Sequence, residues 1–186
     1  MTKLATLFTD SYREFRHVRT ITIAAMFGAV SAVLGYFTIE IGSFIKIGFS
    51  TIANQFVYYL FGPVFGCAFG GALDIIKYLV KPTGEFFPGF TLTAMVGGLL
   101  YGWFLYKRPI SLKRILAAEL VVSIVCNVLM STLWLSMLYG KGFMVLLPMR
   151  AVKNLVMWPI NSMIFYTVAK TMETSGVFRL LKGYGN

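Results

Sequence analysis

Six apolar stretches of membrane-spanning length run through this chain of 186 residues. They cover residues 20–37, 45–61, 63–80, 90–106, 112–139 and 149–172. A helix needs about 20 apolar residues to cross the hydrocarbon of a bilayer, whereas a strand of a membrane barrel alternates over about 10 residues. Because the apolar runs are continuous, and backbone groups in lipid must be paired within the segment, they predict helices. The chain is therefore expected to be an all-α membrane protein, with residues 1–186 forming one transmembrane domain of six helices.

The composition agrees with this class of protein. Hydrophobic residues make up 58% of the chain and charged residues 13%, whereas a soluble domain has about 25% charged residues. The net charge of +10 is spread over segments that flank the apolar stretches, which argues against a nucleic-acid-binding patch. Cys67 and Cys126 lie inside apolar stretches, so they are expected to be free buried thiols and not a disulfide or a metal site.

Positively charged residues are concentrated in alternate connections between the apolar stretches. A cytoplasmic N-terminus places 11 of the 17 Lys and Arg residues on the cytoplasmic side: Lys3, Arg13, Arg16, Arg19, Lys107, Arg108, Lys113, Arg114, Lys170, Arg179 and Lys182. The outer connections then hold only Lys81 and Lys141. Because cytoplasmic loops carry the excess of Lys and Arg, both termini are predicted to be cytoplasmic. Residues 1–19 are expected to include a short helix lying on the membrane surface, and residues 173–186 to form a cytoplasmic tail.

Four cations remain at or within the spans themselves: Lys46, Lys77, Arg150 and Lys153. A charge at membrane depth costs roughly 2.5–3.5 kcal/mol and is a functional hypothesis by default. At helical spacing these cations define three polar faces in the outer half of the membrane: Lys46, Ser50 and Asn54; Asp74, Lys77, Tyr78 and Lys81; and Arg150, Lys153, Asn154, Met157 and Asn161. Their convergence predicts an outward-facing pocket. The alternative is that the cations reach the lipid headgroups and that Asp74 forms a structural ion pair with Lys77.

The predicted pocket has an excess of positive charge, which suits a ligand with carboxylate or phosphate groups. Four aromatic residues are candidates to enclose a planar ring or, alternatively, belong to an interfacial belt: Phe86, Phe87, Phe90 and Trp158. Gly140 and Lys141 lack the upstream glycine of a phosphate-binding loop. Glu119 is expected to pair with Arg114 or Lys113 near the cytoplasmic end of the fifth stretch. The chain is thus predicted to be a binding or transport subunit, with no catalytic residue, metal site or cofactor.

Small residues on the first span form two adjacent stripes. Ala24, Gly28 and Ala32 recur at a spacing of four residues, and Ala25 and Ala29 lie beside them. Small side chains at this spacing let another helix approach closely. The stripes therefore indicate either a docking face for a partner protein or an internal contact with a neighbouring span.

Several short motifs, in this order along the chain, resemble the substrate-binding (S) components of energy-coupling factor (ECF) vitamin transporters. Residues 62–74, GPVFGCAFGGALD, are similar to the motif of their third helix. The pair Ala25 and Ala29 matches the small-residue motif of their first helix, and residues 86–90 with Gly97, Gly98 and Gly102 fit their fourth segment. Residues 147–154, LPMRAVKN, followed by Trp158, Pro159 and Ile160, most resemble the folate-specific member.

The resemblance implies a protein of the bacterial cell membrane with an outward-facing site for folate or a related vitamin. It also implies a transmembrane scaffold subunit and two cytoplasmic ATPase subunits as partners. In this interpretation Asn54, Asp74 and Asn154 contact the pterin, while Arg150, Lys153 and Lys46 hold the carboxylates; the reverse arrangement stays open. An S component for riboflavin, thiamine or biotin, a stand-alone secondary transporter, and a structural membrane subunit without a ligand remain alternatives.

Overall fold

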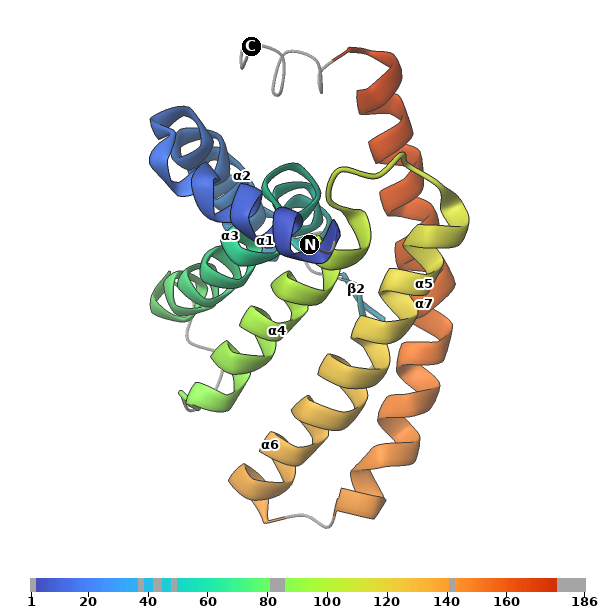
Figure 1. Ribbon diagram of the computed structural model, residues 1–186. Coiled ribbons are helices and arrows are strands. Elements are labelled where there is room, and N and C mark those ends of the chain that lie inside the picture. The colour runs from blue at the N-terminus through green and yellow to red at the C-terminus, as the bar shows by residue number, and fades with distance from the viewer. Residues whose placement is uncertain are drawn as a thin grey trace.

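The computed structural model describes residues 3–36, 39–41, 45–47, 50–80, 86–140 and 143–176. These residues form a helical protein with one short β hairpin (Figure 1). The elements are α1 (Lys3–Arg13), a 3₁₀ turn (Glu14–Arg16), α2 (Val18–Tyr36), β1 (Ile39–Ile41), β2 (Ile45–Ile47), α3 (Ser50–Val80), α4 (Pro88–Leu105), α5 (Leu112–Val122), a π-helical segment (Ser123–Met130), α6 (Ser131–Tyr139) and α7 (Phe143–Thr174). The prediction of a helical protein is confirmed, and the hairpin was not predicted.

Within the described residues, four helical segments are long and apolar enough to cross a membrane: Val18–Gly35, Ser50–Val80, Pro88–Leu105 and Leu112–Leu138. The last of these joins α5, the π-helical segment and α6 into one rod, as expected for the long fifth stretch. The sixth predicted stretch falls within α7, which has 32 residues and contains Arg150 and Lys153. The protein is therefore built as a multi-pass membrane protein.

The helix α3 contains a sharp break between the predicted second and third stretches. Gly62 has φ 87° and ψ −170°, a backbone conformation outside the helix. Pro63 follows and has no N–H to donate to the preceding turn, so a continuous hydrogen-bond ladder is impossible here. The break divides α3 into a first half, residues 50–61, and a second half, residues 63–80.

The predicted start of the second stretch is wrong in the structure. Lys46 lies in β2, where its register partner is Glu40 in β1, and α3 begins only at Ser50. The physical reason is the pattern IEI…IKI, which alternates β-branched and charged residues with the period of a strand. Lys46 therefore does not continue the helical face of Ser50 and Asn54.

The closest packing in the protein lies between the second half of α3 and α4. A side chain on Gly98 would overlap the Gly66 carbonyl oxygen, and a Cβ on Gly70 would lie 2.5 Å from the Ala94 carbonyl oxygen. The two backbones therefore approach each other directly, as small residues allow in membrane helix pairs. In Figure 1, α4 lies between the second half of α3 and the rod formed by α5 and α6. The helix α7 packs along that rod.

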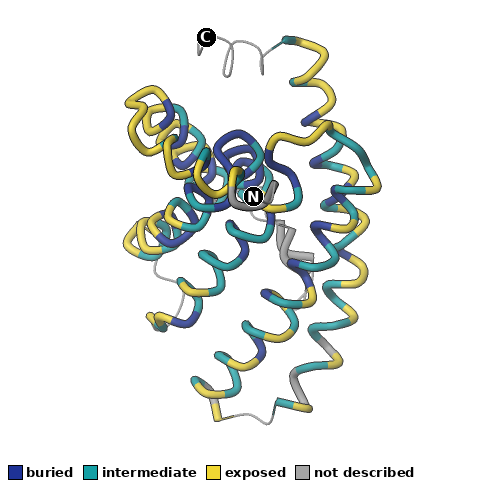
Figure 2. The backbone as a smooth tube through the Cα atoms, in the orientation of Figure 1, coloured by how far each residue is buried: buried dark blue, intermediate teal, exposed yellow. Residues whose placement is uncertain are grey.

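Many residues on the outside of the helices are exposed (Figure 2), and large apolar residues are among them. They include Met26 and Val33 on α2, Leu79 on α3, Met137 on α6 and Leu155 on α7, each more than half exposed. A water-soluble domain buries most such residues, and these face outward on helices of membrane-spanning length. The exposed surface is thus suited to lipid.

The predicted N-terminal helix is present as α1, and one side of it packs on the break in α3. The buried Ser11 hydroxyl donates to the Phe61 carbonyl oxygen at 2.7 Å. It also accepts from the backbone N–H groups of Val64 and Phe65, at 3.0 and 3.1 Å. These groups lose their helical partners at the break, so Ser11 caps both halves of α3. Contact of α1 with the membrane surface stays a prediction.

Candidate ligand-binding site

The helix α7 carries the first group of predicted site residues on one face. Arg150, Lys153 and Asn154 are half-buried. The Arg150 guanidinium reaches the backbone carbonyl oxygen of Asn127 at 3.4 Å, and the Asn154 amide donates to the Arg150 carbonyl oxygen at 2.9 Å. Asn127 belongs to the π-helical segment, a distortion that is frequent at functional sites. This face of α7 is therefore hydrogen-bonded to the π-helical segment that lies between α5 and α6.

The first half of α3 contributes Asn54, whose side-chain oxygen is buried and has no hydrogen-bond partner in the described structure. The hydroxyl oxygen of Thr132, at the start of α6, is also buried and has no hydrogen-bond partner in the described structure. A buried polar atom without a partner costs about 1–3 kcal/mol, so natural proteins rarely leave one unpaired. These oxygens are suited to accept hydrogen bonds from a ligand or from water.

Gln55, beside Asn54, belongs to a buried polar cluster that was not predicted. Its amide donates to Glu119 on α5, and the Tyr101 hydroxyl of α4 donates to the other oxygen of the same carboxylate. The expectation that Glu119 pairs with Arg114 or Lys113 is therefore wrong. The error has a simple cause: Glu119 faces the bundle interior, where Ala118 and Val122 are also buried, and not the cytoplasmic surface.

Asp74 and Lys77 lie on the second half of α3, and Figure 1 places this half across α4 from α7. The Asp74 carboxylate accepts a hydrogen bond of 2.8 Å from the Thr91 hydroxyl on α4. Lys77 is half-buried. The Asp74 side chain is thus held by α4, and a pocket shared by Asp74, Lys77 and Arg150 stays a prediction.

Phe87, which immediately precedes α4, lies in an aromatic cluster beside an open cleft of about 650 Å³. The Phe87 ring centroid lies 5.7 Å from that of Trp134 on α6 and 6.1 Å from that of Phe90. The Trp134 indole donates to the Thr93 hydroxyl at 3.0 Å. The cleft is lined mainly by apolar side chains: Ile75, Phe86, Phe87, Pro88, Gly89, Thr91, Leu92, Met95 and Trp134.

Sequence reasoning missed Trp134 and selected Trp158 in its place. The Trp158 indole donates to the Leu116 carbonyl oxygen at 2.8 Å, so this side chain ties α7 to α5. Trp134 lies in the second half of the fifth stretch, and folding brings its ring against Phe87. A tryptophan at either end of a span has the same interfacial character, and the sequence alone does not distinguish the two.

The two small-residue stripes on α2 have different surroundings. Ala24 and Gly28 are buried, and a Cβ on Gly28 would lie 3.4 Å from the Phe69 ring on α3. Ala25 and Ala29 are exposed, and Ala32 is half-buried. One stripe therefore packs inside the protein, while the other lies on the free surface of α2.

The chain is similar to known membrane proteins over most of its length. Residues 19–169 match the model of the family described as ECF transporter, substrate-specific component. A folate transporter FolT from Clostridium novyi (strain NT) is 37% identical over 129 residues, 69% of this chain and 75% of the relative. A folate transporter FolT from Leuconostoc mesenteroides is 29% identical over 154 residues, 80% of this chain and 83% of the relative.

A solved structure, FolT bound with folic acid, resembles this fold with a TM-score of 0.75 and 29% sequence identity. The match covers 83% of this chain and 95% of the solved chain. The family match at residues 19–169 contains the candidate site residues Asn54, Arg150 and Asn154. The chain therefore belongs to the family of substrate-specific components of ECF transporters.

Proposed function

We propose that this protein is a folate-binding S component, which captures the vitamin at the outer face of the bacterial cell membrane. The observation that carries the proposal is the match to FolT bound with folic acid over 83% of this chain. Two relatives that are folate transporters support the same ligand. The protein itself hydrolyses no ATP in this proposal. It delivers folate through a transmembrane scaffold that is driven by two cytoplasmic ATPase subunits.

The chemistry of the α7 face suits this ligand. Folate has a planar pterin, an aromatic linker and a glutamate with two carboxylates. Arg150 and Lys153 are proposed to bind the carboxylates, because guanidinium and ammonium groups make charge-assisted hydrogen bonds with them. The amides of Asn54 and Asn154 are proposed to pair with the pterin, which presents both donors and acceptors. The buried, unpartnered oxygen of Asn54 supports this assignment.

The other predicted residues take supporting roles. Lys46, in β2, is proposed to bind a ligand carboxylate as a further cation. Phe87 and Trp134 are proposed to form an aromatic wall beside α4. Asp74 is proposed to hold α3 on α4 through Thr91, with Lys77 beside it. This role differs from a direct ligand contact, because the Asp74 carboxylate is already bonded to α4.

The proposed topology has six transmembrane helices, with both termini in the cytoplasm. The break at Gly62 supports this count, since it divides α3 where the sequence predicts two spans. The distribution of Lys and Arg supports the orientation. The exposed stripe of Ala25 and Ala29 is proposed as the docking face for the scaffold subunit.

Two measurements test the ligand. The protein is purified in detergent and denatured, and the released small molecules are identified by mass spectrometry, with folate as the expected product. In parallel, calorimetric titrations compare folic acid with riboflavin, thiamine and biotin. Tight binding of one of these three vitamins, without binding of folic acid, would overturn the folate proposal and leave the family unchanged. Absence of any bound vitamin in both measurements would favour a structural subunit.

A further inference from the structure

Glu119 is the centre of a buried polar contact between three helices. Its carboxylate accepts a hydrogen bond of 2.5 Å from the Gln55 amide on α3 and one of 2.6 Å from the Tyr101 hydroxyl on α4. The exposed fractions of Glu119, Gln55 and Tyr101 are 6%, 1% and 5%. Both donors are neutral, and none of these groups has access to bulk water. The contact is therefore strong and strictly local.

Leu116, one helical turn before Glu119 on α5, holds a fourth helix. Its carbonyl oxygen accepts the hydrogen bond of the Trp158 indole on α7. Trp158 follows Asn154 by four residues and Arg150 by eight, so all three lie on one face of α7. At 1.5 Å per residue, Trp158 lies about 6 Å along the axis from Asn154 and about 12 Å from Arg150.

The hydrogen bond between Gln55 and Glu119 also fixes the segment of α3 that carries Asn54. Gln55 is the next residue along α3, and its hydrogen bond to Glu119 holds this helical turn against α5. The side-chain oxygen of Asn54 remains buried without a partner in the described structure. The hydrogen bonds of Gln55 and Trp158 thus connect α3 and α7, the two helices whose side chains are proposed to bind folate, through α5.

We propose that Glu119 is a positioning residue for ligand binding, which holds α3 on α5 and so sets the separation between Asn54 and the Arg150 face, because Trp158 ties α7 to the same helix α5. The hydrogen-bonding side chains that meet α5 here form a polar layer of four residues: Gln55, Tyr101, Glu119 and Trp158. The inference rests on the proposed function, because it takes Asn54 and Arg150 as ligand contacts. Glu119 itself does not touch the ligand. It acts by keeping the two sides of the pocket at a fixed distance, since binding groups must be held within about 0.5 Å of their productive positions.

The test compares Glu119→Leu with the conservative variant Glu119→Gln in the full-length protein. Leucine removes both acceptor oxygens, so Gln55 and Tyr101 lose their partner and α3 is no longer tied to α5. Glutamine retains an acceptor for Tyr101 and offers an N–H group to the Gln55 carbonyl oxygen. Folic acid affinity is expected to fall about tenfold in Glu119→Leu, the equivalent of one hydrogen bond, and to be largely restored in Glu119→Gln.

Tyr101→Phe is the milder variant, because it removes one hydroxyl and keeps the ring, which stacks on Tyr58 with 5.9 Å between the ring centroids. It keeps the test informative where Glu119→Leu fails to fold, and a smaller loss of affinity in the same direction is expected. Ser11→Ala is the matched control. It removes the three hydrogen bonds that the buried Ser11 hydroxyl makes at the break in α3, so it is expected to lower thermal stability and leave folic acid affinity unchanged.

The outcomes separate the inference from the proposed function. If the wild-type protein binds no folic acid, the proposed function is overturned, and the inference falls with it. If the wild-type protein binds and Glu119→Leu or Tyr101→Phe binds equally well, the inference alone is overturned. An equal loss of affinity in Ser11→Ala also overturns it, because affinity would then follow global stability. Loss in Glu119→Leu with recovery in Glu119→Gln supports positioning by the polar layer.

Discussion

Arg150 is the residue on which the proposed site depends most. A guanidinium has five N–H donors, and one of them reaches the Asn127 carbonyl oxygen at a long 3.4 Å. It is half-buried on a helix whose neighbouring surface is apolar, where a charge is costly unless it is solvated or paired. A ligand carboxylate would pair with the charge and accept two of the remaining N–H groups in bidentate geometry. This explains why the residue is suited to an anionic vitamin.

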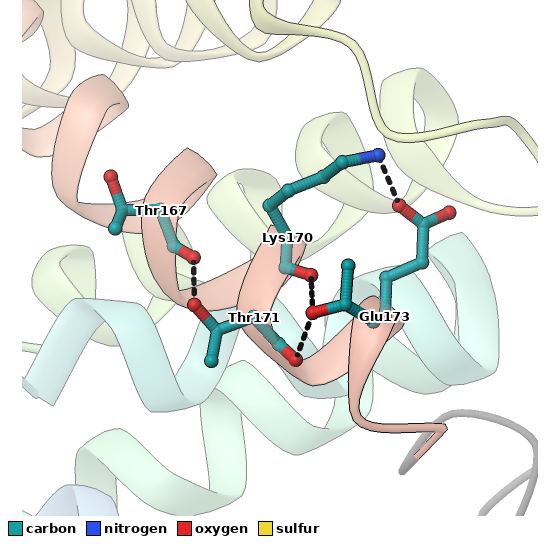
Figure 3. Close-up of polar contacts among 5 residues, drawn as sticks. Thr167, Lys170, Thr171 and Glu173 are labelled. Atoms are coloured by element: carbon teal, nitrogen blue, oxygen red, sulfur yellow. Dashed lines mark hydrogen bonds and ion pairs between the residues drawn. The ribbon is translucent and has the colours of Figure 1, made fainter.

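Replacing Arg150 by Ala is therefore expected to weaken folic acid binding by about 1.5–3 kcal/mol, the value of a hydrogen bond to a charged group. Calorimetry on the detergent-solubilised protein measures the change. Lys170→Ala is the control on the same helix, about 30 Å away along the axis. Lys170 pairs with Glu173 at 3.0 Å among the threonines of the last turns (Figure 3), and its replacement should leave the affinity unchanged. Equal affinities in wild type and Arg150→Ala would remove Arg150 from the site.

Residues such as Glu119 show where prediction from sequence reaches its limit. The sequence identified the unusual cations, because each of them breaks a pattern of apolar residues. It assigned Glu119 to the nearest cations along the chain, whereas the actual partners are 64 and 18 residues away. Pairing over such separations depends on how helices pack. Trp134 was missed for the same reason, since its partners Phe87 and Thr93 come from α4.

At the scale of elements, the helices could be predicted because hydrophobic length alone requires them in lipid. The predicted stretches 20–37 and 90–106 agree with α2 and α4 to within about two residues, the usual uncertainty at helix ends. The start of α3 could not be placed in this way. A continuous apolar run hides the short alternation in residues 45–47, which form β2. The predicted boundary between residues 61 and 63 coincides with the break at Gly62, where Pro63 disfavours a continuous helix.

The close approach of α3 and α4 leads to a stability prediction. Gly98→Ala is expected to lower the stability by about 3 kcal/mol, the upper part of the range for overpacking, because its Cβ would meet the Gly66 backbone. The adjacent Gly97 is the matched control. A Cβ there would lie 3.8 Å from the Cys126 sulfur, an ordinary contact, and alanine is the better helix former. Thermal unfolding in detergent should therefore show a lower midpoint for Gly98→Ala only. Similar midpoints for both variants would show that α3 and α4 do not approach each other as closely at Gly98 as the structure indicates.

At the scale of the whole molecule, α2 has two faces with different roles: one packs on α3, and the other is exposed. Ser31, Gly28 and Ala24 face α3, and the Ser31 hydroxyl donates to the Ser50 carbonyl oxygen at 3.0 Å. The opposite face presents Ala25 and Ala29 among exposed apolar residues such as Met26. The internal face is needed for the fold. The outer face is available to another helix, and the small residues allow that helix to approach closely.

A tryptophan at each of two adjacent positions tests this division. Ala25→Trp places its ring on the exposed face, where substitutions usually change stability by less than about 0.5 kcal/mol. Folic acid affinity of the isolated subunit should therefore stay near the wild-type value, because the proposed pocket is formed by other helices. Folate uptake by cells that contain the scaffold and ATPase subunits should be lost, since the ring prevents close helix approach.

Ala24→Trp provides the comparison, because Ala24 is 3% exposed and part of the hydrophobic core. A large ring there overpacks the contact between α2 and α3, so stability, folic acid binding and uptake should all decrease together. Binding by the purified subunit and uptake by the assembled transporter are measured for both variants. If Ala25→Trp lost folic acid binding as Ala24→Trp does, the outer face of α2 would have a structural role. Loss of uptake with binding intact in Ala25→Trp alone identifies that face as the contact through which the subunit meets its scaffold.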